Sequence, residues 1–184
     1  MPDGQTVTGW ENDPGWYWRW TYETWRGLFY PDKLPKTKEL SHASRRVTSI
    51  EVNGTFYSTF TPSVFRRWAD ETPDDFIFSL KAPRFAVNRR VLAEAGPSIE
   101  KFLASGVSEL KSKLGPILWQ LAPTKKYDPE DIAAFLELLP EKFDGLKLRH
   151  ALEVRNESFR SADLIAQVRK AGIAVVLADS QKYR

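Results

Sequence analysis

Two glutamates within short predicted strands are the residues of this sequence best suited to chemistry. Glu51 lies in the segment 47–53 and Glu153 in the segment 151–155. Two carboxyl groups can serve as general acid and base, or as acid and nucleophile, as in glycoside hydrolysis. Lys81 and Arg155 add cations that suit a phosphate or carboxylate group. This set favours a hydrolase acting on a sugar-like or phosphorylated substrate, with Glu153 as the leading acid or base and Glu51 as its partner.

Strand alternation places these residues on one side of a sheet. Side chains i and i+2 share a face, so Glu51 and Asn53 lie opposite the apolar Ile50 and Val52. If the apolar faces meet helices, the polar faces point into a barrel at the carboxyl ends of the strands, where ligands bind. Seven residues share this placement, namely Glu51, Asn53, Lys81, Gln120, Glu153, Arg155 and Asp179. The alternative is a self-satisfied polar network, Glu51 with Lys81 and Glu153 with Arg155; we favour a binding site because the whole set meets at one mouth.

The residue types that the chain lacks exclude several kinds of metal and cofactor site. It has no cysteine and two histidines, which excludes a thiolate zinc site, a cysteine nucleophile and any site built from several imidazoles. No glycine-rich phosphate loop follows the first strand, and no other cofactor motif is present. A metal site would have to be oxygen-rich, built from Glu51, Glu153 and Asp179, and would suit magnesium or manganese. No ligand spacing is diagnostic of one, so the cofactor stays open.

The balance of positive and negative residues limits what can be said about binding partners. With 27 Lys and Arg against 24 Asp and Glu, the net charge of +3 permits a nucleic-acid partner without implying one. A nucleic-acid-binding module that uses Arg84, Arg89, Arg90 and the aromatics is the alternative function, since Phe56 and Tyr57 could stack a sugar ring or a base. No apolar run approaches the roughly 20 residues of a membrane span, and the start resembles no signal or transit peptide. We therefore expect a soluble cytoplasmic protein with a small-molecule substrate.

The elements that position the polar set follow from an alternation of short apolar runs with helix-like segments, which is typical of βα units and a parallel sheet. Thr61-Pro62 and Asp128-Pro129 begin two helices, and Pro97-Ser98 begins a third that we expect to continue to Gly115. Gly172 ends the helix before the last strand. We expect strands at 47–53, 76–81, 117–121, 151–155 and 173–179, and an earlier one within 17–20.

The unit length indicates the architecture. Six units in the 168 residues from 17 to 184 give 28 residues each, close to one βα crossover. An eight-unit barrel takes about 250 residues. The predicted fold class is therefore α/β and TIM-barrel-like, with about six βα units of an eight-unit barrel. Residues 1–16 form an atypical N-terminal extension, and residues 17–184 a single partial domain.

Six ordered motifs resemble the domain-of-unknown-function 72 family, also called YecE-like. They are Trp-Arg-Gly-Leu-Phe-Tyr-Pro at 25–31, Ile-Glu-Val-Asn-Gly-Thr-Phe-Tyr at 50–57, Phe-Ser-Leu-Lys-Ala-Pro-Arg-Phe at 78–85, Leu-Gly-Pro-Ile-Leu-Trp-Gln-Leu-Ala-Pro at 114–123, Leu-Glu-Val-Arg-Asn-Glu-Ser-Phe at 152–159 and Leu-Ala-Asp-Ser at 177–180. The resemblance implies a TIM-barrel-like fold and no established reaction. The family's recurring polar positions fall on Glu51, Asn53, Thr55, Tyr57, Lys81, Gln120, Glu153, Arg155 and Asp179.

Three departures from the family pattern matter. Tyr17-Trp18-Arg19 stands where members carry a Gly-rich strand, and Asn156 stands where histidine is common, which removes an acid–base group. Members also continue for roughly two more βα units beyond the point where this sequence ends. The resemblance thus implies an open barrel whose parallel edges invite self-association, and it leaves open that the chain is a truncated fragment without independent activity.

Overall fold

The computed structural model describes residues 23–178. The expected strand within 17–20, the N-terminal extension 1–16 and the candidate residue Asp179 lie outside this range. Within it, no helix is long and apolar enough to cross a membrane.

A five-stranded parallel sheet forms the centre of the described structure. Its strands are β1 (Ser49–Val52), β2 (Ile77–Lys81), β3 (Leu114–Gln120), β6 (His150–Glu153) and β7 (Ala174–Val175). They lie in the order β1-β2-β3-β6-β7, so spatial neighbours are also neighbours along the chain apart from one inserted hairpin. The α/β class with a parallel sheet is confirmed. The strand expected at 173–179 is shorter than predicted, and β1 and β7 lie at the two edges of the sheet in this part of the chain.

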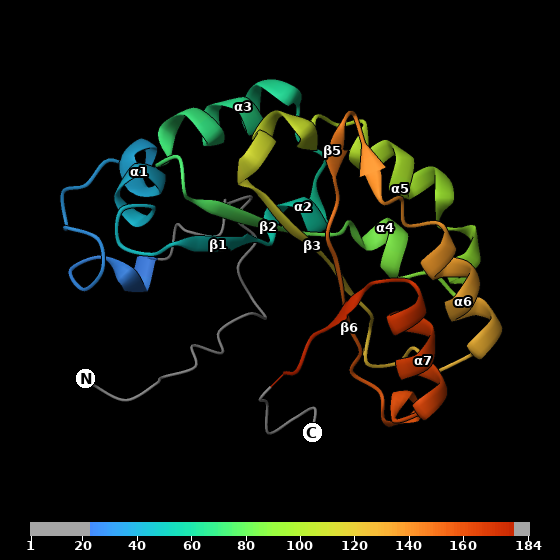
Figure 1. The fold of residues 1–184 in the computed structure, drawn as a ribbon. Coiled ribbons are helices and arrows are strands. Elements are labelled where there is room, and N and C mark those ends of the chain that lie inside the picture. Colours follow the sequence, from blue (N-terminus) through green and yellow to red (C-terminus); the bar gives the residue numbers. More distant parts are fainter. Residues whose placement is uncertain (1–22, 179–184) are drawn as a thin grey trace.

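Helices connect successive strands and cover one face of the sheet. The main ones are α3 (Pro62–Glu71), α5 (Gly96–Leu103), α6 (Pro129–Glu137) and α7 (Ala162–Lys170). They lie along the outer, convex side of the curved sheet (Figure 1). Shorter elements complete the fold, namely α1 (Glu39–Ala43), α2 (Gly54–Tyr57), α4 (Arg84–Val87), the 3-10 turns η1 (Glu23–Trp25), η2 (Lys36–Lys38), η3 (Leu92–Glu94), η4 (Val107–Lys113) and η5 (Glu157–Phe159), and the hairpin of β4 (Lys142–Phe143) and β5 (Leu146–Lys147).

Helix starts follow the predicted caps. The Asp128 carboxylate accepts the backbone N–H groups of Glu130 and Asp131 at the start of α6, which satisfies donors that have no partner within the helix. Pro62 occupies the first turn of α3, where its missing N–H costs nothing. Gly172, at φ +66°, follows the end of α7.

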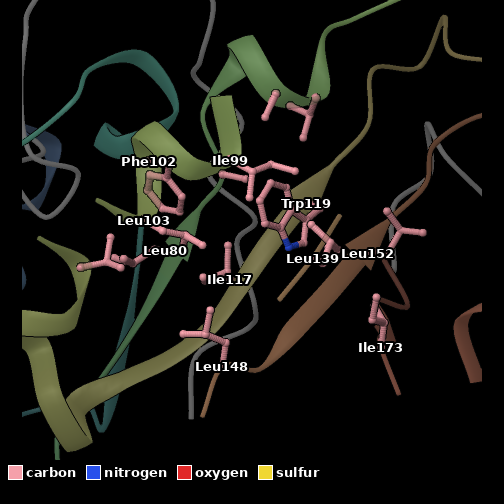
Figure 2. Packing of buried hydrophobic residues seen from close by; sticks show 14 of the residues in the cluster. Leu80, Ile99, Phe102, Leu103, Ile117, Trp119, Leu139, Leu148, Leu152 and Ile173 are labelled. Atoms are coloured by element: carbon pink, nitrogen blue, oxygen red, sulfur yellow. The ribbon is translucent and has the colours of Figure 1, made fainter. Parts of the chain in front are cut away.

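The apolar faces of the strands pack against the helices, as alternation predicts. Val52, Phe78, Leu80, Trp119 and Leu152 are all fully buried in one hydrophobic cluster. Figure 2 shows this packing around side chains of β2, β3 and α5, including Leu80, Ile117, Trp119, Ile99, Phe102 and Leu103. Because these residues use one face of the sheet, the polar residues between them must use the other.

The expected single helix from Pro97 to Gly115 is wrong. The helix α5 ends at Leu103, and Gly106 adopts φ +108°, a left-handed conformation that breaks the helix before η4. Gly115 lies inside β3 rather than at a helix end. A Cβ atom there would sit 2.6 Å from Ile77 Cγ2 and 2.8 Å from the carbonyl oxygen of Phe78, so glycine permits the close approach of β2 and β3.

Candidate functional site

Strand register brings the polar residues together at the carboxyl end of the sheet. Glu51 of β1 pairs with Ser79 of β2, two residues before Lys81. Lys81 pairs with Leu118 of β3. Gln120, two residues further along β3, pairs with Glu153 of β6. Paired residues share a face, so Glu51, Lys81, Gln120 and Glu153 all lie on the face opposite the helices.

Glu153 is the buried anchor of the polar group and is 5% exposed. We call this group the polar cluster; it consists of Glu51, Asn53, Lys81, Gln120, Glu153 and Arg155. Gln120 Nε2 donates to Glu153 Oε2 at 2.7 Å, and Arg155 Nε donates to Glu153 Oε1 at 2.7 Å. Both carboxylate oxygens thus have strong donors, the condition under which a buried charge is tolerated. The pairing of Glu153 with Arg155 that the sequence allows is confirmed.

Glu51 is the accessible carboxyl group of the polar cluster. Its side chain reaches solvent, but the protein atoms around it remove enough water to raise the pKa of Glu51. The charge of Lys81 opposes that effect and the charge of Glu153 adds to it, while a hydrogen bond with Asn53 and the charge of Arg155 lower the pKa. Burial wins, so the protonated form is more populated than for an ordinary glutamate. The charges that influence Glu51 therefore come from β2 and from the end of β6.

Lys81 is held beside an aromatic ring at the end of β2. The residue is 6% exposed, and its ammonium nitrogen lies 5.2 Å from the centre of the Phe56 ring. This cation–π contact helps to offset the loss of water around the charge. The charge of Lys81 also acts on Glu51, whose pKa it lowers.

The short helix α2 and the residue before it include three of the expected residues, in different settings. Asn53 is 9% exposed just before the helix. The Thr55 hydroxyl lies 2.9 Å from the carbonyl oxygen of Val52 and 2.6 Å from that of Lys81, so it links the ends of β1 and β2. Tyr57 is 49% exposed, with its ring 4.9 Å from that of Phe56 in an edge-to-face arrangement. Thr55 therefore supports the site through the backbone, whereas Tyr57 faces solvent.

Asn156 and the Lys125–Asp131 pair hold the loops around the polar cluster. Asn156 Nδ2 donates to the carbonyl oxygen of Pro123 at 2.7 Å, and its Oδ1 accepts from the backbone of Ser158, which joins the loop after β3 to the loop after β6. Lys125 bonds Asp131 at 2.6 Å and the carbonyl oxygen of Arg90 at 2.7 Å. Sequence analysis missed these roles. An Asn-x-Ser cap after Arg155 was the available signal for the first.

The remaining expectations concern metals and basic side chains. In the part of the chain from 23 to 178, no group of three or more His, Asp or Glu side chains is arranged to hold a metal ion. Asp179, the third carboxylate of the expected set, lies outside the described residues. Arg84 and Arg90 are exposed, while the Arg89 guanidinium bonds the carbonyl oxygen of Phe85 and the hydroxyl of Ser98.

A separate surface hollow lies at the other end of the sheet. It is lined by Ser44, Arg45, Arg46, Val47, Thr48, Pro73, Asp75 and Phe76, which precede β1 and β2. The polar cluster follows these strands, so the hollow is not part of the candidate site.

Sequence and structure comparisons point to one family. The family model described as "Protein of unknown function DUF72" matches residues 17–184. Over 115 residues the chain is 31% identical to the UPF0759 protein YecE of Escherichia coli (strain K12), an alignment that covers 60% of this chain and 41% of YecE. The chain therefore spans about two fifths of the length of this curated relative.

Solved structures of the same family share the fold. A DUF72 family protein from Thermotoga maritima MSB8 has a TM-score of 0.68 at 22% identity, covering 90% of this chain and 66% of that one. One from Enterococcus faecalis V583 has a TM-score of 0.64 at 19% identity, covering 78% and 59%. The motif resemblance is thus confirmed by an independent match over nearly the whole sequence. This chain belongs to the DUF72 family.

Proposed function

We propose that the polar cluster binds an anionic small molecule, sugar-like or phosphorylated, and hydrolyses it by acid–base catalysis. The observation that carries the proposal is the convergence of two carboxyl groups, an ammonium, a guanidinium and two amides on one face at the carboxyl end of a parallel sheet. Ligands of open parallel sheets and barrels bind at this end. A face needed only for folding would be more stable with apolar residues.

The cations supply the affinity for an anion. Lys81 is nearly buried, and charges act more strongly where water is excluded. Arg155 uses Nε for Glu153, and a guanidinium has further N–H donors for a ligand oxygen. When Glu51 and Glu153 are both ionised, their two negative charges cancel the two positive charges of Lys81 and Arg155. Protonation of Glu51 leaves the polar cluster with one net positive charge. Anion binding and a proton on Glu51 therefore favour each other.

The contacts favour Glu51 as the leading acid or base and Glu153 as its partner, the reverse of the roles expected from the sequence. Glu153 has both oxygens engaged and positions Gln120 and Arg155. Glu51 is accessible, and its raised pKa suits a group that gives and takes a proton. Glu51 donates its proton to the leaving oxygen as the bond from that oxygen to carbon or phosphorus breaks. Water adds its hydroxyl to that carbon or phosphorus, and the remaining proton of the water returns to the Glu51 carboxylate. Asn53, Gln120 and Tyr57 orient the substrate.

The architecture proposed for this site is TIM-barrel-like. Support comes from five parallel strands in chain order and from helices on the convex side of the sheet (Figure 1). The strand register puts the polar residues on the opposite face. An experimental structure that includes residues 17–22 and 179–184 tests the proposal. Strand pairing between β1 and residues 17–20 is expected, and an uncovered β1 edge there would count against it.

The nucleic-acid alternative has less support. Arg89 is committed to Phe85 and Ser98, which leaves Arg84 and Arg90 as the exposed arginines of that run. Two arginines on one loop give few phosphate contacts, and the affinity of a nucleic-acid interface grows with the number of such contacts.

The test is a hydrolysis screen with matched variants. Purified protein is assayed against nitrophenyl phosphate and nitrophenyl glycosides, followed by Glu51→Gln, Glu153→Gln and the control Glu137→Gln, an exposed glutamate of α6. Glu51→Gln is expected to lower kcat at least about 100-fold with little change in KM, as for loss of a general acid. Glu137→Gln should keep wild-type rates. Full activity of Glu51→Gln would overturn its role, and no turnover of any substrate would overturn the hydrolytic proposal.

A further inference from the structure

Two aromatic side chains are exposed at the same end of the sheet as the polar cluster. Tyr57 at the end of α2 is 49% exposed, and Phe85 in α4 is 62% exposed. The helices α2 and α4 directly follow the neighbouring strands β1 and β2, so both rings lie at the carboxyl end. A single exposed ring is common on protein surfaces, but two exposed rings at the end of the sheet that carries the polar cluster offer stacking surfaces to a ligand bound there.

Contacts connect Tyr57 to the cationic part of the polar cluster. Its ring packs on Phe56 with centres 4.9 Å apart, and the Phe56 ring lies 5.2 Å from the ammonium of Lys81. The Thr55 hydroxyl, 2.6 Å from the carbonyl oxygen of Lys81, fixes α2 to the end of β2. Tyr57 is therefore separated from Lys81 by a single ring, on a segment that is tied down.

Phe85 is held by contacts of its backbone, and the residue is 62% exposed. Arg89 Nε donates to the carbonyl oxygen of Phe85 at 2.7 Å, and Arg89 Nη2 donates to the Ser98 hydroxyl at 3.0 Å. These bonds anchor α4 to α5. The Arg84 guanidinium lies 5.0 Å from the centre of the Phe85 ring, so a delocalised cation and an aromatic ring are presented together.

We propose that the ligand of the polar cluster carries a planar aromatic ring joined to its anionic group, as a nucleotide does; this rests on the proposed function. The anion binds at Lys81 and Arg155, and the ring stacks on Tyr57 and Phe85. Bases stack on both aromatic rings and guanidinium planes, which is the pair of surfaces that Phe85 and Arg84 offer. A sugar ring alone has no aromatic face to exploit the guanidinium.

The experiment compares adenosine 5′-monophosphate with ribose 5-phosphate by titration calorimetry. The two probes share pentose and phosphate and differ by the base. Wild-type protein is expected to bind the nucleotide at least about tenfold more tightly. Phe85→Ala should weaken nucleotide binding about tenfold and leave ribose 5-phosphate binding unchanged, and Tyr57→Ala should weaken nucleotide binding more than it weakens ribose 5-phosphate binding. Tyr57→Phe should retain the affinity, and Ile165→Ala, an exposed apolar residue of α7, serves as the control.

The outcomes separate this inference from the proposed function. Equal affinity of the wild type for both probes, or alanine variants that bind the nucleotide as well as the wild type does, would overturn the aromatic contribution while ribose 5-phosphate binding upholds the anion site. No binding of either probe, or of inorganic phosphate, would overturn both. Thermal melts of each variant confirm that it is folded, which the exposure of both rings leads us to expect.

Discussion

The two faces of the parallel sheet use alternate residues of the same strands in opposite ways. On the helix side, Phe78 and Leu80 are completely buried among apolar side chains. On the other side, Lys81 and Glu153 are also nearly buried but carry charge. Burial stabilises the first set directly, whereas the second must be stabilised by partners. The difference teaches that one face maintains the fold, whereas the other holds charged groups in place at a cost in stability, which the proposed binding function would explain.

Removing an aromatic ring from the helix side of the sheet should have the largest effect on the free energy of unfolding. Phe78→Ala is expected to lower the free energy of unfolding by about 3–5 kcal/mol, because it empties a fully enclosed volume. Urea denaturation measures this. The control is Ser79→Ala on the opposite face, which removes one hydrogen bond to the carbonyl oxygen of Pro116 and should cost about 1 kcal/mol. Equal losses would mean that the two faces do not differ as described.

Replacing Glu153, the anchor of the polar cluster, should have the second largest effect on the free energy of unfolding. Glu153→Gln places an amide against the Nε–H of Arg155 and removes the charge that both donors use. We expect a loss of about 2 kcal/mol in urea denaturation, since hydrogen bonds to charged groups contribute about 1.5–3 kcal/mol. A loss below 0.5 kcal/mol, the range of ordinary surface substitutions, would show that Glu153 is not an anchor.

A polar group on the helix side should respond to pH. The Trp119 indole N–H donates to His150 Nδ1 at 3.0 Å, so the neutral ring carries its proton on Nε2, 2.9 Å from the carbonyl oxygen of Pro140. Burial lowers the pKa of His150, so the unfolded chain takes up this proton at a higher pH than the folded one. Stability should fall as the pH drops below about 6.5, by up to about 1.4 kcal/mol per pH unit.

The measurement is urea denaturation of wild type and His150→Gln between pH 7.5 and pH 5. The wild type should lose more stability across this range than the variant does, with the second histidine present in both proteins. Parallel pH profiles would show that His150 is not held in its neutral form.

The smallest stability effect is expected at Glu51. Its raised pKa means that the ionised carboxylate is less favourable in the folded chain than in water, and that its contribution to stability rises as the pH falls through the folded pKa. Glu51→Gln should therefore change the free energy of unfolding at pH 7 by no more than about 0.5 kcal/mol, with zero or slight stabilisation. A loss comparable to that of Glu153→Gln would make Glu51 a structural residue and remove the distinction between the two carboxyl groups.

Alternation made the two faces predictable from the sequence, because Glu51, Lys81 and Glu153 each follow an apolar residue of a short strand. The link from Glu153 to Gln120 was not predictable, since it depends on the register of β3 against β6. Nor was the helix break before η4, where the apolar spacing continues through Gly106 although the backbone turns left-handed. The role of Asn156 depends on Pro123, a contact between distant loops.

The most direct test of the central claim, that the polar face is a ligand site, is thermal unfolding with a panel of phosphorylated sugars and nucleotides. Wild type is compared with Lys81→Met, which keeps much of the aliphatic stem and removes the cation. Since a ligand that binds only the folded chain raises Tm, at least one panel member should raise Tm of the wild type and leave that of Lys81→Met unchanged. If no member shifts the wild type, or if both proteins shift alike, the polar face is a self-contained network and the claim fails.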